Sequence, residues 1–183
     1  MRFHQLNANL WLSQIFALHV LFFASPTSES MPIGVILGIG GFLLLFASAC
    51  HLSPIRQDGG VQGVYRWVRH PQLVGALLLG LGMSFAALSF SSLCLLLLLF
   101  PFYASQQIKA QEQKYAAELQ ASYIEYKNQV PQFFPGLGLP WARRREKLEV
   151  NRVSFKELAS NVYFIGIFLQ VGIVYLLLLI KMH

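Results

Sequence analysis

Two basic side chains and one acidic side chain flank one long uncharged stretch of the sequence. Arg69 and His70 come directly before this stretch, and Glu112 follows it closely. Cationic donors and a carboxylate acceptor of these kinds can bind the charged groups of a small ligand. Pro71 follows His70, and proline favours the first position of a helix. The sequence therefore indicates a polar site where a helix begins.

The elements that position these side chains are apolar runs. The chain has 183 residues, of which 55% are hydrophobic and only 12% are charged. A helix needs about 20 apolar residues to cross a bilayer. The uncharged run 71–108 is too long for one crossing, so we expect two helices that turn near Ser89. The predicted spans are 9–25, 33–52, 72–88, 91–107 and 159–180.

These spans predict an all-α polytopic membrane protein with about five transmembrane helices, one of them paired with its neighbour in a helical hairpin. We expect a single domain, 1–183. Because a hairpin starts and finishes on the same side of the membrane, Arg69 and His70 should lie near Lys109 and Glu112. Ionisable groups at membrane depth are costly, so they are candidates for a functional site.

A stripe of residues follows the hairpin at steps of three and four, which is typical of one helix face. The helix should end before Pro131. Glu112 at the head of the stripe either binds a ligand or caps the positive end of a helix. Arg66 and Arg69 are either site residues or interface anchors. The stripe consists of Glu112, Tyr115, Leu119, Tyr123, Tyr126 and Val130.

Two further patterns concern packing and metals. Gly34 and Gly38 form a GxxxG motif, which predicts close helix packing. Cys50 and Cys94 lie in apolar runs without metal-ligand spacing, so no metal site is predicted.

The formal net charge of +6 indicates orientation rather than a nucleic-acid partner. The basic residues gather in the segments 53–70 and 106–157. We therefore expect an integral membrane protein, of a bacterial inner membrane, whose N-terminus and site are cytoplasmic. His183 should then lie outside.

Two stretches carry a resemblance to a known family. GVYRWVRHPQLVGALLLGLG, residues 63–82, and QEQKYAAELQASYIEYKNQVPQFFP, residues 111–135, resemble the cofactor-binding signature of the isoprenylcysteine carboxyl methyltransferase and phospholipid methyltransferase superfamily. The resemblance implies a binding region at 59–136 for S-adenosylmethionine. The histidine and the acidic pair of the family's signature are similar to His70 and Glu112. The GxG of that signature looks like Gly80 and Gly82.

A cofactor with a carboxylate, an ammonium and a sulfonium also needs donors and aromatic faces. Tyr65, Tyr123 and Tyr126 can offer such faces. Trp67 either offers one too or belongs to the aromatic belt at the membrane interface. The predicted cofactor-binding residues are Tyr65, Arg69, His70, Gly80, Gly82, Glu112, Tyr123 and Tyr126.

The chain departs from the family pattern at three positions. The acidic pair is reduced to Gln111 and Glu112, Gln107 stands where an arginine is usual, and Leu73 replaces a common tyrosine. The missing arginine disfavours a carboxylate as the methyl acceptor, since that cation would pair with it.

The resemblance implies transfer of a methyl group from S-adenosylmethionine to a lipid-like or other amphipathic substrate at the cytoplasmic membrane face. One alternative is a membrane reductase of the related sterol-reductase type, which binds NADPH. The other is a non-catalytic membrane protein with a relic site. Binding of S-adenosylhomocysteine or of NADPH discriminates among them.

Overall fold

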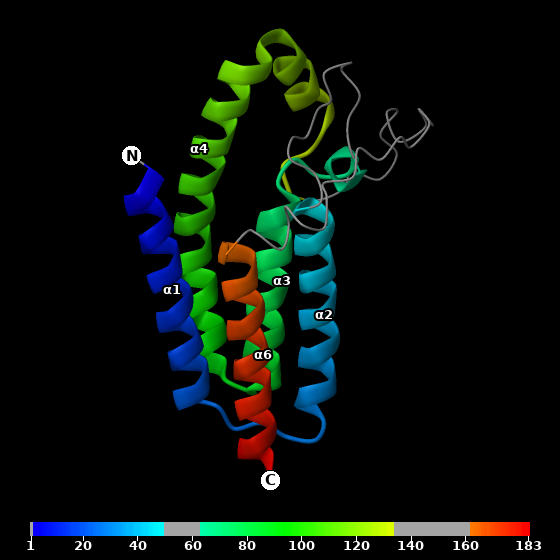
Figure 1. Ribbon diagram of the computed structural model, residues 1–183. Coiled ribbons are helices and arrows are strands. Elements are labelled where there is room, and N and C mark those ends of the chain that lie inside the picture. Colours follow the sequence, from blue (N-terminus) through cyan, green and yellow to red (C-terminus); the bar gives the residue numbers. More distant parts are fainter. Residues whose placement is uncertain (1, 50–62, 134–161) are drawn as a thin grey trace. The chain divides into compact units, whose positions relative to one another are not determined.

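The computed structural model describes residues 2–49, 63–133 and 162–183, and all the regular elements in these ranges are helices (Figure 1). The predicted all-helical class is therefore confirmed for the described residues. The elements are α1 (Arg2–Phe22), α2 (Ser30–Ala49), the 3₁₀ helix η1 (Gly63–Arg66), α3 (Pro71–Ala86), α4 (Phe90–Gln129) and α6 (Val162–Met182).

Each predicted span overlaps one α-helix, although residues 50–52 and 159–161 of two spans lie outside the described residues. Within the described residues, α2 and the Phe90–Ala117 part of α4 are long and apolar enough to cross a membrane. The other three helices have shorter apolar stretches, so a five-span topology stays a prediction. These stretches are Leu12–Phe22, Pro71–Ala86 and Leu169–Met182.

The turn between α3 and α4 lies where the serines predict it. Leu88 adopts a left-handed conformation with φ of 47°. The amide of Ser89 donates to the carbonyl of Ser84 at 3.1 Å, and the amide of Leu88 donates to that of Phe85 at 3.0 Å. These two bonds form a Schellman motif, which ends a helix. The Ser89 hydroxyl then accepts from the amide of Ser92 at 3.3 Å and so caps α4.

The chain divides into two compact units. The first comprises Met1–Gly40, Leu78–Phe100 and Asn161–His183. In it α1 and α6 are joined by the side chain of Gln170, whose amide nitrogen donates to the Ser13 carbonyl at 2.9 Å. Its core consists of Ala17, Val20, Ala24, Met31, Met83, Ala86, Ala87, Val174 and Leu178.

Glycines let the helices of the first unit approach closely. A Cβ on Gly34 would collide with the backbone of Ala86, and one on Gly38 would collide with the Tyr175 hydroxyl. A Cβ on Gly82 would lie 2.7 Å from both the Gly34 carbonyl oxygen and the Gly38 amide nitrogen. The packing role predicted for the GxxxG motif is confirmed.

The second unit comprises Gly41–Leu77 and Pro101–Ser160, and in it α4 folds back on itself. The rings of Tyr115 and Tyr123 lie 5.8 Å apart between centroids. Eight residues of straight helix would separate them by about 12 Å along the axis. Figure 1 shows this sharp curl of α4 in its light-green to yellow part. We call residues 121–131, which run back after the curl, the returning arm.

Aromatic packing and backbone bonds hold the returning arm in place. Tyr123, Tyr126 and Val130 form a buried cluster with Tyr115 against it. The carbonyl of Pro131 accepts from the Arg69 amide at 2.9 Å. The helix ends at Gln129, as predicted from Pro131. Tyr115 thus meets Tyr123, Tyr126 and Val130 of the predicted stripe across a bend rather than along a straight helix.

Close helix packing at Gly82 gives a first testable prediction. Gly82→Ala forces two backbones apart, so it should lower the free energy of unfolding by about 1–3 kcal/mol. The matched control is Gly40→Ala, because no described atom outside its own stretch of helix lies within 4 Å of that Cβ position. Alanine there should be neutral or stabilise the helix by up to about 1 kcal/mol. Thermal unfolding in detergent, followed by circular dichroism, compares the variants, and equal effects would contradict the packing.

Candidate functional site

The start of α3 fixes the two residues that precede it. Pro71 occupies the first position of the helix. The His70 carbonyl accepts from the amides of Leu73 and Val74 at 3.0 and 3.3 Å, so His70 is the N-cap residue. Since proline has no amide hydrogen to satisfy, it suits this position. The side chains of Arg69 and His70 are therefore presented from a rigid helix start.

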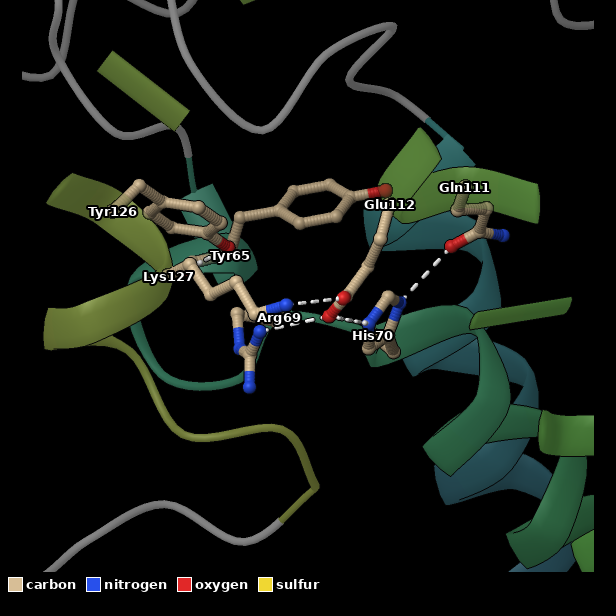
Figure 2. Close-up of polar contacts among 7 residues, drawn as sticks. All are labelled: Tyr65, Arg69, His70, Gln111, Glu112, Tyr126 and Lys127. Carbon is tan, nitrogen blue, oxygen red and sulfur yellow. Dashed lines mark hydrogen bonds and ion pairs between the residues drawn. The ribbon is translucent and has the colours of Figure 1, made fainter. Parts of the chain in front are cut away.

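Glu112 lies at the centre of a cluster of cationic and polar side chains (Figure 2). Its Oε1 accepts from a terminal nitrogen of Arg69 at 2.8 Å, and its Oε2 accepts from Lys127 Nζ at 2.7 Å. His70 Nε2 lies 3.6 Å from Oε1. The predicted convergence of Arg69, His70 and Glu112 is confirmed, and all of these residues belong to the second unit.

This geometry settles the open alternatives for Glu112 and for Arg69, and leaves that for Arg66 open. Glu112 lies far inside α4, which begins at Phe90, so it is not at a helix N-terminus. The interpretation of Glu112 as a helix cap is wrong, because one continuous helix carries the apolar segment and the polar stripe. Arg69 is largely buried in an ion pair, so an exposed interface anchor does not describe it.

Two glutamines orient the His70 ring. Gln111 Oε1 lies 3.0 Å from His70 Nδ1, and Gln111 Nε2 donates to Gln72 Oε1 at 3.4 Å. With Gln111 so oriented, Nδ1 must carry the hydrogen, which is an assignment from the hydrogen-bond network. In the neutral ring Nε2 then has a free lone pair facing Glu112.

Burial lowers the pKa of His70 below its usual 6.5. The hydrogen bond with Gln111 and the charge of Glu112 oppose this shift, while Arg69 adds to it. His70 is therefore a neutral acceptor near pH 7. Neither Gln72 nor Gln111 was among the predicted site residues, because a neutral amide carries no charge signal in the sequence.

The tyrosines pack together beside the charged cluster. The Tyr126 hydroxyl donates to the Tyr65 carbonyl at 2.9 Å, and both rings are buried. Burial, and to a lesser degree the Glu112 carboxylate, raises the pKa of Tyr123 to about 12. Burial also raises the pKa of Tyr65 and of Tyr126. All three remain neutral phenols, and Trp67 is largely exposed.

Two buried nitrogens lack a hydrogen-bond partner among the described residues. They are Arg69 Nε and His70 Nε2. A buried polar group without a partner costs about 1–3 kcal/mol. The pair combines a donor, the Arg69 N–H, with an acceptor, the His70 lone pair. Such atoms beside Glu112 make this cluster a candidate binding position for a ligand that offers both an acceptor and a donor.

The structure brings six of the eight predicted residues together in the second unit: Tyr65, Arg69, His70, Glu112, Tyr123 and Tyr126. Gly80 and Gly82 belong to the first unit. A Cβ on Gly80 would lie 2.7 Å from Leu96, and Gly82 is required by helix packing. Helix packing thus accounts for Gly82, whereas at Gly80 only the flexible end of the Leu96 side chain would have to shift. Contact of either glycine with a cofactor stays a prediction.

The buried neutral His70 predicts how stability depends on pH. Its pKa is lower in the folded protein than in the unfolded chain, so the unfolded chain binds more protons below about 6.5. The free energy of unfolding should therefore fall as the pH drops from about 7 to about 5. His70→Gln should flatten this dependence, measured by chemical unfolding in detergent. His183→Gln, at the exposed last residue, is the matched control, and equal slopes for His70→Gln and wild type would contradict a buried neutral ring.

Comparison with known proteins adds one distant similarity. A stretch of 79 residues, 43% of this chain, is 33% identical to the protein-S-isoprenylcysteine O-methyltransferase of Saccharomyces cerevisiae. The match spans 31% of the length of the yeast protein. No family model and no solved structure matches the chain. In part of its length, the chain is therefore similar to a methyltransferase.

Proposed function

We propose that this protein is an integral membrane methyltransferase that uses S-adenosylmethionine. One observation carries the proposal: Glu112 stands beside the unpartnered Arg69 Nε and His70 Nε2. The cofactor's amino-acid end has an ammonium, which donates, and a carboxylate, which accepts. The similarity to the yeast methyltransferase supports the same reaction class.

The residues of the second unit divide the binding tasks by their chemistry. Glu112 would accept from the ammonium, and the neutral His70 Nε2, 3.6 Å from Glu112 Oε1, suits the same donor. The Arg69 Nε–H would donate to the carboxylate. Tyr65, Tyr123 and Tyr126 are buried, so they would shape the site by packing beside the charged cluster. Burial of this cluster strengthens each of these interactions, because the local dielectric is lower than in water.

When bound, the cofactor would supply a methyl group on a positively charged sulfur. Transfer to an acceptor is a direct displacement, so the protein needs no covalent intermediate. Its residues have to position the reactants and exclude water. The acceptor we propose is an oxygen, nitrogen or sulfur of an amphipathic, lipid-like molecule that reaches the site from the bilayer.

A nicotinamide cofactor such as NADPH matches the charged cluster around Glu112 less well than S-adenosylmethionine does. Its phosphates need free cations, whereas Arg69 and Lys127 are both paired with Glu112. The carboxylate at the centre of the cluster would repel a phosphate. The reductase is therefore kept as an outcome of the test.

Calorimetric titration of the detergent-solubilised protein tests the proposal. Wild type should bind S-adenosylhomocysteine and not NADPH. Glu112→Gln removes a charged acceptor and should weaken binding by about 1–3 kcal/mol. Glu125→Gln is the matched control, because it makes the same change on an exposed carboxylate of α4. NADPH binding alone would indicate a reductase, and binding of neither ligand would indicate a relic site.

The orientation of the protein is part of the proposal. The basic segments 53–70 and 106–157 lie on the cytoplasmic side, and His183 lies outside. The test starts from a chain with Cys50 and Cys94 replaced by serine. Single cysteines at Asp58→Cys and Gly138→Cys should resist an impermeant thiol reagent in intact cells and react after lysis. Labelling of either cysteine from outside would invert the topology.

A further inference from the structure

Glu112 already holds two cations within the protein. Arg69 occupies Oε1 and Lys127 occupies Oε2, both at hydrogen-bond distance (Figure 2). With His70 neutral, these three side chains carry one surplus positive charge. A ligand that places a further cation on Glu112 would make three cations around one carboxylate. The three cations would then compete for the same two carboxylate oxygens, of which Arg69 and Lys127 already occupy one each.

Lys127 is the cation that can leave. Its side chain is 48% exposed, whereas that of Arg69 is 12% exposed. An ammonium that turns from a partly exposed ion pair into water loses little, because such pairs contribute only about 0–1 kcal/mol. A buried guanidinium that loses its carboxylate has no water to replace the lost ion pair, so its displacement is costly. Arg69 is also tied by its amide to the Pro131 carbonyl.

Displacement of the Lys127 side chain from Glu112 by another cation, called the exchange below, requires no movement of the backbone. The returning arm is held by the buried Tyr123, Tyr126 and Val130 and by the bond from Tyr126 to the Tyr65 carbonyl. Lys127 projects from this anchored segment on a flexible four-carbon stem. The side chain can rotate away from Glu112 while the arm stays packed.

We propose that Lys127 is an internal substitute for the ligand's ammonium, and that a cationic ligand group displaces it from Glu112. The inference rests on the proposed function and adds a specificity-determining residue to it. Lys127 neutralises Glu112 while no ligand is bound. A ligand with an ammonium regains this interaction, and a ligand without one leaves Lys127 in place.

Two nucleosides that differ at the amino-acid end provide the test. S-adenosylhomocysteine has the ammonium and the carboxylate, and 5′-methylthioadenosine has neither. In Lys127→Met the competitor is gone, so S-adenosylhomocysteine should bind about 2- to 5-fold more tightly, the range expected for a half-exposed ion pair. The affinity for 5′-methylthioadenosine should not change. Both are measured by calorimetry.

Matched variants separate competition from general effects of charge. Lys181→Met removes an exposed cation of α6, in the first unit, and should leave both affinities unchanged. Lys127→Arg keeps a cation opposite Glu112 and should retain the wild-type ratio of the two affinities. Lys127→Gln replaces Lys127→Met if the latter does not fold.

The outcomes distinguish this inference from the proposed function. If wild type binds S-adenosylhomocysteine but Lys127→Met binds it equally or less tightly, the exchange is wrong and the function stands. An equal gain for 5′-methylthioadenosine would also overturn the exchange, because that ligand has no ammonium. If wild type binds neither nucleoside, the proposed function fails and the exchange fails with it.

Discussion

The ion pair between Glu112 and Arg69 is the interaction on which the second unit depends. A carboxylate close to an apolar helix is costly unless it is paired and hydrogen-bonded. Arg69 comes from the segment that begins α3, and Lys127 comes from the returning arm, so one carboxylate joins three parts of the chain that are distant in sequence. Removing Glu112 would leave the buried Arg69 without its counter-charge, whereas removing Arg69 would leave Glu112 with the half-exposed Lys127 alone. Each residue of the pair therefore constrains the other.

The continuity of α4 gives this pair its position. A single helix from Phe90 to Gln129 carries an apolar first part and a polar second part. Within the second unit, Glu112 follows Pro101 by eleven residues, which is about 17 Å along a helix axis. The curl between Tyr115 and Tyr123 then brings Lys127 back to Glu112, although fifteen residues separate them. Without the curl, Lys127 would lie about 22 Å along the axis from Glu112.

The convergence of Arg69, His70 and Glu112 could be predicted from the sequence because it follows from charge and from the length of an uncharged run. The turn at Ser89 and the stop before Pro131 have equally local signals. The curl of α4 has none: the steps of three and four are the same in a straight helix as in a bent one. Lys127 was missed for that reason, and the cap at Glu112 was wrongly kept open because a polar stripe resembles a separate helix. Gln72 and Gln111 act through hydrogen bonds that charge patterns do not reveal.

Glycine motifs show a different limit of prediction from the sequence. A glycine on a helix face leaves room, and the sequence does not say whether a ligand or another helix fills it. At Gly82 the carbonyl of Gly34 and the amide of Gly38 come so close that a methyl group has no place. At Gly80 the side chain of Leu96 occupies the room. Helix packing alone is sufficient reason for Gly82, and a leucine side chain that can shift leaves the reason for Gly80 open. The proposed function therefore stands on the polar cluster around Glu112, where two buried nitrogens need a partner that no described residue supplies.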